Sequence, residues 1–144
     1  MAVKYVDVRL GDGAKLPAKQ HHGDAGWDLF VSRPAVIGPG QTVDVHTDVF
    51  VGLPARTYLR IVGRSSSLRR HRLLINEGII DNGYTGELFI CVHNLGSEPF
   101  YVEPGTRLAQ AIFGTIDDVR WSEVEEVPTS KDGRGGSGFG STGV

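Results

Sequence analysis

The sequence predicts a single-domain, all-β fold: a β-barrel or jelly roll of short, mostly antiparallel strands with one short helical turn. Two observations lead to this expectation. The 144 residues include 20 glycines and 7 prolines, and breakers at that density leave little room for long helices. Short alternating or β-branched runs recur between turn signals along most of the chain. The length fits one domain.

The clearest alternation lies in residues 43–51. Asp44, His46 and Asp48 share one face and small or apolar residues share the other, as expected for a single half-buried strand. Trp27 is expected to be a buried aromatic where a loop enters a strand. The remaining expected strands cover residues 3–10, 57–62, 86–93, 98–102, 108–113 and 121–127.

Residues 76–88 are the stretch around which the chain is organised. Two isoleucines run into Asp81, and Asn82-Gly83 then supplies the positive φ angles of a two-residue hairpin turn. A carboxylate held at the mouth of a tight hairpin suits a general base. Asp and Asn are also common in ordinary turns, so these residues alone leave both interpretations open.

Composition restricts the partners and the compartment. A net charge of −2 disfavours direct nucleic-acid binding, which requires a basic surface. No apolar stretch reaches membrane-spanning length, so no membrane association is expected. The N-terminus lacks the apolar core of a secretory signal, and the single cysteine, Cys91, excludes an intrachain disulfide. These features predict a cytoplasmic protein, or an intracellular one in a host cell.

A second candidate site is the segment Gly-Arg-Ser-Ser-Ser-Leu at residues 63–68, which opens the short helical turn. Backbone N–H groups and Arg64 would suit a phosphate there, whereas a serine N-cap would explain the same residues structurally. Gln110 stands among apolar neighbours and needs hydrogen-bond partners, from the fold or from a ligand. Asp28 is compatible with a structural role or with a place near an active site.

The C-terminal end differs in composition from the rest. Residues 133–143 are too rich in glycine to order themselves, so we expect a core over residues 1–128 and a flexible arm over residues 129–144. Either the arm is a flexible end without a role, or Arg134, Phe139 and the arm's hydroxyl side chains grip phosphate and stack on a base when a ligand binds.

Five separated stretches resemble the homotrimeric deoxyuridine 5′-triphosphate nucleotidohydrolase (dUTPase) family. The resemblance runs from Asp24 to Gly143, with the motifs in the family's order and approximate spacing. The motifs are Asp24-Ala-Gly-Trp-Asp-Leu29, Gly63-Arg-Ser-Ser-Ser-Leu68, Gly78-Ile-Ile-Asp-Asn-Gly-Tyr-Thr-Gly-Glu87, Gly105-Thr-Arg-Leu-Ala-Gln110 and Arg134-Gly-Gly-Ser-Gly-Phe-Gly-Ser-Thr-Gly143. Trp27 replaces a more usual tyrosine, an extra serine precedes Leu68, and Gly83 stands where the family often has a second acid.

The resemblance implies the dUTPase-like β-clip fold and a role for each matching residue. Asp81 would deprotonate the attacking water, Tyr84 would lie under the deoxyribose and exclude a 2′-hydroxyl, and Asp28 would contact Mg²⁺ through water. Main-chain groups around the turn would read the uracil edge, and the arm would stack on the base and close over the γ-phosphate. The implied substrate-binding residues are Arg64, Ser65, Ser66, Asn76, Ile79, Ile80, Tyr84, Phe89, Gln110, Arg134, Phe139, Gly140, Ser141 and Thr142.

The implied activity is hydrolysis of dUTP to dUMP and pyrophosphate by Mg-assisted attack of water on the α-phosphate. This reaction would limit uracil incorporation into DNA and supply dUMP. The resemblance also implies a homotrimer in which three chains share each active site and the arm of one chain closes a site on others.

Two other functions stay open. A dCTP deaminase, or a bifunctional dCTP deaminase/dUTPase, shares the fold and resembles the motifs around Arg64 and Asp81, but its catalytic glutamate aligns with Cys91. A cysteine does not shuttle protons in that role, and the glycine-rich arm with Phe139 resembles that of the hydrolase. The other alternative is a nucleotide-switched regulator that binds a protein partner, which is compatible with catalytic activity.

Overall fold

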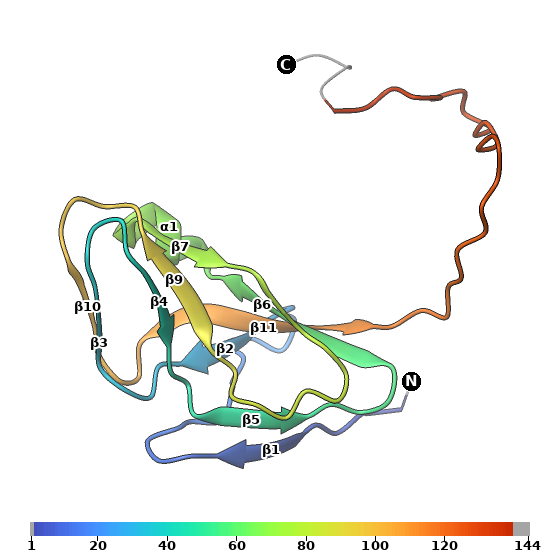
Figure 1. The fold of residues 1–144 in the computed structure, drawn as a ribbon. Helices are drawn as coiled ribbons and strands as arrows, with labels where there is room; N and C mark the ends of the chain where they lie inside the picture. Colours follow the sequence, from blue (N-terminus) through green and yellow to red (C-terminus); the bar gives the residue numbers. More distant parts are fainter. Residues whose placement is uncertain (1, 140–144) are drawn as a thin grey trace.

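The computed structural model describes residues 2–139, which contain eleven strands and one short helix (Figure 1). The elements in chain order are β1 (Asp7–Leu10), β2 (Trp27–Phe30), β3 (Ala35–Ile37), β4 (Thr42–Val45), β5 (Val49–Gly52), β6 (Thr57–Gly63), α1 (Ser65–His71), β7 (Leu73–Asn76), β8 (Gly78–Ile80), β9 (Ile90–Asn94), β10 (Phe100–Val102) and β11 (Arg107–Thr115). All ladders between them are antiparallel. The predicted all-β fold with one helical turn is therefore confirmed.

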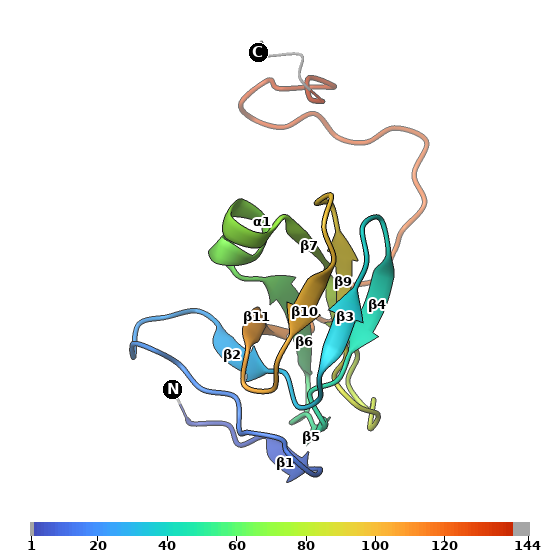
Figure 2. The same cartoon turned by 90° about the vertical axis from the view of Figure 1, so that its left-hand side faces the viewer.

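The strands divide among four small sheets. The largest has the order β2-β11-β6-β8, a second has the order β4-β9-β7, and the pairs β1-β5 and β10-β3 complete the set. Both views place α1 at one end of the molecule and the β1–β5 pair at the opposite end (Figures 1 and 2). Within residues 2–139 no sheet closes on itself, so the fold is jelly-roll-like rather than a closed barrel.

A single apolar core is built from the inward faces of these sheets. In β6, Thr57, Leu59 and Ile61 are buried and the residues between them are half-buried, which is the period-two pattern of a strand with one face on the core. Ile90 and Val92 repeat this pattern in β9. The long strand β11 lies between β2 and β6 and pairs with both, so residues of β2 and β6 come close together on either side of β11.

The expectation of one continuous strand over residues 43–51 is wrong. β4 ends at Val45 and β5 begins at Val49. Between them Asp48 adopts a left-handed φ of 52°, which interrupts the pleat of a strand. Asp48 is buried as a result, instead of lying in a solvent-facing row with Asp44.

The expected tight hairpin at Asn82-Gly83 is also wrong. β8 pairs with β6, whereas β9 pairs with β4 and β7. Of the two turn residues, only Gly83 has a positive φ, of 96°. The β7–β9 ladder ends at the pair Asn76↔Cys91, so the two arms of this ribbon separate there. Residues 77–89, in which β8 pairs with β6, connect the two arms and are called the open loop.

Two further expectations differ from the structure. Trp27 is 37% exposed, and Lys19 Nζ lies 5.0 Å from the centre of its ring. Residues 121–127 form no strand, because no neighbouring strand of the same chain accepts their backbone hydrogen bonds. In Figure 1 the described chain beyond β11 runs away from the body of the molecule. The division into a core over 1–128 and an arm over 129–144 stays a prediction. Within residues 2–139 no helix has the length and apolar character needed to cross a membrane.

Candidate active site

The first part of the candidate site is a carboxylate held between two arginines. Asp28 on β2 lies opposite Gln110 on β11. Arg64 Nε is 3.1 Å from Asp28 Oδ1, and Arg107 Nη1 is 3.2 Å from Asp28 Oδ2. Two guanidinium groups around one carboxylate leave a net positive charge, which suits a triphosphate. In the sequence, Arg107 is a member of the fourth motif, but no role in binding was predicted for it.

Gln110 joins the first and second motifs. Its Nε2 donates to the Gly63 carbonyl at 3.3 Å, so the hydrogen-bond partner that it needs comes from the fold. A Cβ at Gly26 would lie 2.0 Å from Gln110 Oε1, so the glycine of the first motif makes room for this amide. Contact between Gln110 and a phosphate stays a prediction.

The three serines at the start of α1 have different surroundings. Arg64 is the N-cap and no side chain caps the helix, so the serine N-cap interpretation is wrong. Ser65 is exposed and Ser66 is half-buried, which leaves both available to a ligand. Ser67 is buried, and its Oγ donates to the Leu108 carbonyl at 2.6 Å. The extra serine therefore fastens α1 to β11.

The second part of the candidate site is the turn that carries Asp81, whose side chain is exposed in the single chain. The Tyr84 N–H donates to the Asp81 carbonyl at 3.1 Å and closes the turn. Asn82 Nδ2 donates to the carbonyls of Pro54 and Thr57 at 2.8 and 3.0 Å. These two bonds fasten the turn to the connection between β5 and β6, so the backbone that carries the carboxylate has a fixed position.

Tyr84 folds back over the open loop. Its Oη donates to the Glu87 carbonyl at 2.9 Å, and the residue is 41% exposed. A Cβ at Gly86 would lie 2.4 Å from Tyr84 Oη, so the ring keeps this place only because residue 86 is glycine. A half-exposed ring that is fixed at its hydroxyl end offers a flat apolar surface of the kind expected under a sugar.

The two parts lie at opposite ends of β6. Ile80 pairs with Leu59, Asp81 lies one residue beyond that pair, and Arg64 lies five residues beyond it in the other direction. At about 3.3 Å per residue, these six steps separate Asp81 from Arg64 by roughly 20 Å. One chain therefore does not bring the carboxylate of Asp81 to the arginine pair.

The other predicted residues take places outside both parts. Asn76, Ile79, Ile80 and Phe89 lie along the open loop or at its ends, with Ile79 and Phe89 substantially exposed. Arg134 and Phe139 are exposed on the arm, where Arg134 Nε donates to the Ser137 carbonyl. Gly140, Ser141 and Thr142 lie outside the described residues.

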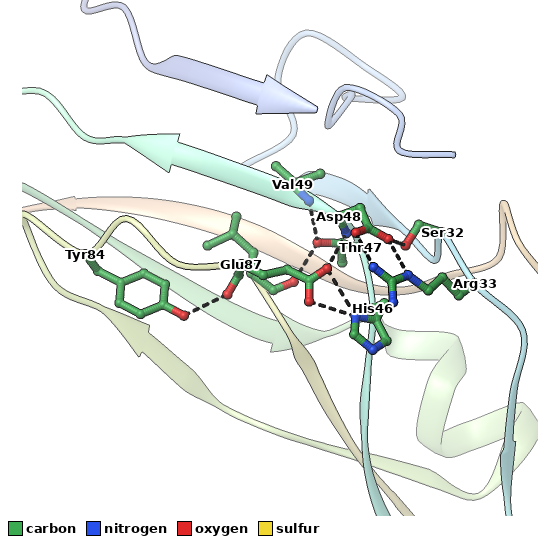
Figure 3. Close-up of polar contacts among 9 residues, drawn as sticks. Ser32, Arg33, His46, Thr47, Asp48, Val49, Tyr84 and Glu87 are labelled. Atoms are coloured by element: carbon green, nitrogen blue, oxygen red, sulfur yellow. Dashed lines mark hydrogen bonds and ion pairs between the residues drawn. The ribbon is translucent and has the colours of Figure 1, made fainter. Parts of the chain in front are cut away.

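A polar cluster beside the open loop was not expected from the sequence (Figure 3). The Asp48 carboxylate accepts hydrogen bonds from Ser32 Oγ at 2.6 Å and from Arg33 Nε and Nη2 at 2.8 and 2.7 Å. The hydrogen bonds from Arg33, followed by the one from Ser32, hold the pKa of Asp48 well below its usual range. The Glu87 carboxylate contacts His46 Nδ1 at 2.8 Å and accepts the Asp48 N–H at 2.9 Å.

Two carboxylate groupings are candidates for a Mg²⁺ contact: Asp28 with its two arginines, and the cluster of His46, Asp48 and Glu87. Mg²⁺ binds oxygen ligands and keeps several of its waters. Both oxygens of Asp28 face an arginine in the single chain, so a contact between Asp28 and Mg²⁺ through water stays a prediction. His46, Asp48 and Glu87 also bring ligand-type atoms within 4.8 Å of one another. Their carboxylate oxygens are already engaged in hydrogen bonds, and Arg33 adds a positive charge, so this cluster does not fit a cation.

Comparisons with known proteins agree with the motifs. The dUTPase family model matches residues 12–143. The deoxyuridine 5′-triphosphate nucleotidohydrolase of Clostridioides difficile is 39% identical over 137 residues, which cover 94% of each chain. That of Mus musculus is 36% identical over 137 residues, which cover 94% of this chain and 83% of the mouse protein.

Solved structures show the same relationship. The dUTPase of Staphylococcus bacteriophage 80alpha with dUpNHpp matches with a TM-score of 0.90 at 28% identity, over 99% of this chain and 100% of the phage chain. A mutant dUTPase of the S. aureus phage phi11, in which a structural Mg(II) ion is coordinated, matches with a TM-score of 0.79 at 27% identity, over 85% and 98% of the two chains. Since the family model covers most of the sequence and full-length relatives exceed one third identity, the chain belongs to the dUTPase family.

Proposed function

We propose that this chain hydrolyses dUTP to dUMP and pyrophosphate. The relatives from Clostridioides difficile and mouse carry the name deoxyuridine 5′-triphosphate nucleotidohydrolase, and the bacteriophage 80alpha neighbour was solved with the dUTP analogue dUpNHpp. The observation in this chain that carries the proposal is the turn at Asp81, which presents an exposed carboxylate on a backbone that Asn82 holds in place. A fixed carboxylate at an open loop is what a general base for water needs.

The proposed reaction uses the two parts of the site for different steps. Asp81 accepts a proton from a water molecule whose oxygen forms a bond to the α-phosphorus, and the bond from that phosphorus to the bridging oxygen breaks as pyrophosphate leaves. A general base contributes about 10²–10⁴-fold to the rate. Arg64 and Arg107 stabilise the negative charge of the phosphates. Ser65 and Ser66 follow Arg64 directly, at the start of α1. Mg²⁺, when bound near Asp28, would offset further triphosphate charge.

The proposed active site is assembled from several chains of a homotrimer. The separation of roughly 20 Å between Asp81 and Arg64 supports this arrangement, because phosphate binding and proton abstraction must meet on one substrate. A neighbouring chain would supply Asp81 and Tyr84 to the arginine pair. The arm of a further chain would bring Arg134, Phe139 and the hydroxyl groups of Ser141 and Thr142 over the bound nucleotide.

The deaminase alternative is less well supported. Cys91 occupies the position that aligns with the deaminase glutamate, and burial, followed by the nearby Asp44, raises the pKa of its thiol. A thiol that stays protonated at neutral pH does not carry protons between water and a base.

A protein regulator is a further proposal for this chain. Structures of the bacteriophage 80alpha dUTPase describe phage dUTPases as controlling the transfer of virulence genes by a G protein-like mechanism. The structural likeness to that enzyme supports a protein partner, which would act beside hydrolysis rather than replace it. We also propose that the protein is intracellular, because both the nucleotide and such a partner would be found inside cells.

The test is a panel of nucleotides, dUTP, dCTP, dTTP and UTP, with release of pyrophosphate and of ammonia measured in parallel. Pyrophosphate from dUTP alone supports the proposal, whereas ammonia from dCTP or equal hydrolysis of all four would contradict it. Asp81→Asn keeps the turn and a similar side-chain shape, so it should bind dUTP normally and lose about 10²–10⁴-fold in kcat. Near-normal turnover of this variant would remove Asp81 from the role of base.

A further inference from the structure

We propose that Glu87 is a positioning residue for nucleoside selection, and that its buried carboxylate, held by His46 and Asp48, keeps Tyr84 in the place that excludes a ribose. This inference rests on the proposed function, in which Tyr84 lies under the deoxyribose. Glu87 would touch no substrate atom itself. It acts through the conformation of the open loop.

The first step is the setting of the Glu87 side chain. Glu87 is 8% exposed, and a buried carboxylate is costly unless hydrogen bonds compensate it. Its Oε1 accepts the Asp48 N–H at 2.9 Å, and its Oε2 lies 2.8 Å from His46 Nδ1 (Figure 3). Asp48 has a left-handed φ of 52°, and its N–H points at the Glu87 carboxylate. The side chain of Glu87 thus has one fixed place between two partners from the β4–β5 connection.

The second step links this side chain to Tyr84. The Glu87 carbonyl accepts the hydrogen bond from Tyr84 Oη at 2.9 Å, so the residue that is clamped through its carboxylate also holds the tyrosine through its backbone. The next residue is fixed as well: the Leu88 carbonyl accepts Thr47 Oγ1 at 2.6 Å, and the Leu88 N–H donates to the Val49 carbonyl at 2.9 Å. The position of the Tyr84 hydroxyl therefore depends on how residues 87–88 are held.

The third step concerns Phe89, which follows residues 87–88 in the chain. The His46 ring meets the Phe89 ring edge to face, with 5.1 Å between the ring centres. His46 therefore contacts both the Glu87 carboxylate and Phe89, which the family resemblance implies to be a substrate-binding residue. Both aromatic residues of the open loop are tied to the same cluster.

Charge balance explains why the cluster contains five polar residues. Asp48 and Glu87 would repel each other if both were buried as bare carboxylates. Arg33 forms a bidentate pair with Asp48, with its Nη2 2.7 Å from Oδ1, and Ser32 supplies a further donor. The backbone N–H of Asp48 donates to the Glu87 carboxylate, while the Asp48 side chain binds Arg33 and Ser32. Asp48 therefore links the two carboxylate groups without direct contact between them.

The experiment measures the selectivity for deoxyribose, as the ratio of kcat/KM for dUTP to kcat/KM for UTP, in the full-length protein. Glu87→Ala removes both acceptors, and we expect the ratio to fall about tenfold, with the larger change in KM. Glu87→Gln keeps an acceptor oxygen for the Asp48 N–H and should restore most of the ratio, with a loss of about threefold. His46→Ala, at a partly exposed position, should lower the ratio as Glu87→Gln does.

Glu77→Gln is the matched control, because it makes the same change in an ion pair with Arg60 at the surface. Its ratio should equal that of the wild type. If Glu87→Ala does not fold, as judged by thermal unfolding, Glu87→Gln and His46→Ala carry the test.

Two failures can be told apart. If the wild type hydrolyses dUTP but variants of Glu87 and His46 lower the melting temperature without changing the dUTP/UTP ratio, Glu87 is only a structural residue and the inference is overturned. If the wild type does not hydrolyse dUTP at all, the proposed function fails, and the inference fails with it.

Discussion

Asp81 and Arg64 lie at opposite ends of β6. The Ile80↔Leu59 pair fixes the turn that carries Asp81 at one end, and Arg64 precedes α1 at the other end. The ladder between β6 and β8 makes this separation rigid. A fluctuation of the loop does not close a gap of roughly 20 Å, because that would require β8 to leave the sheet. In the proposed mechanism, which uses both residues on one substrate, a second copy of the chain would supply one of them.

Mixing two inactive variants tests this conclusion. Asp81→Asn and Arg64→Ala should each be inactive alone. After subunit exchange of an equal mixture, about a quarter of the sites would combine an intact Arg64 with an intact Asp81 from different chains, so about a quarter of the wild-type rate should return. The measurement is pyrophosphate release after brief partial denaturation and refolding of the mixture. If no activity returns although mixed oligomers form, the two residues act within one chain.

Removal of residues 133–144 tests the arm. This segment forms no part of any described sheet, so its loss should leave the melting temperature and the oligomeric state unchanged. Hydrolysis of dUTP should fall by at least about tenfold, because closure over the phosphates would be lost. The truncated and full-length proteins are compared by thermal unfolding, light scattering and pyrophosphate release. Normal hydrolysis by the truncated protein would contradict a role for the arm.

Two neighbouring serines should respond in opposite ways. Ser67→Ala removes a buried hydrogen bond to the Leu108 carbonyl and should lower the free energy of unfolding by about 0.5–1.5 kcal/mol. Ser65 is exposed, so Ser65→Ala should leave stability unchanged and raise KM for dUTP. Urea unfolding and steady-state kinetics on both variants separate the two roles. Equal stability of the two variants would show that Ser67 does not anchor α1.

Asp48 makes stability depend on pH in the acid range. Hydrogen bonds from Arg33 and Ser32 lower its pKa in the folded state, so the folded protein holds this proton less tightly than the unfolded chain. The resulting stabilisation is present above the unfolded pKa of about 3.9 and is lost as the pH falls through the lower folded pKa. Asp48→Asn, whose side chain also tolerates a left-handed φ, should therefore be less stable than the wild type at pH 7.

The measurement is urea unfolding at several pH values from neutral to strongly acidic. The stability gap between Asp48→Asn and the wild type should narrow as the solution becomes more acidic. Asp12→Asn, at an exposed position, serves as the control and should show no such trend. A gap that stays constant with pH would mean that the Asp48 carboxylate does not contribute through its ionisation.

The sequence predicts the fold class well because strand signals are local. The strand expected over residues 57–62 is β6, which extends one residue further to Gly63. Pairing is not local, and the sequence was wrong where pairing decides the structure: β8 joins β6 instead of turning back on the next strand. Asp48 shows the same limit, since its burial depends on Arg33, fifteen residues earlier in the chain. Family motifs placed Asp28, Arg64 and Gln110 among the candidate site residues, whereas Glu87 stood in a motif without any indication of its partners.

The described chain leaves β11 at Thr115 and continues outward without a further strand, so the arm is tethered to the core by a segment without strands. A tethered segment searches a small volume, equivalent to a local concentration on the order of millimolar for a short flexible linker. Closure of the arm over the bound nucleotide would then be a first-order process, whose rate does not change on dilution as long as the oligomer stays assembled. A synthetic peptide with the sequence of residues 129–144 would compete only near that same concentration.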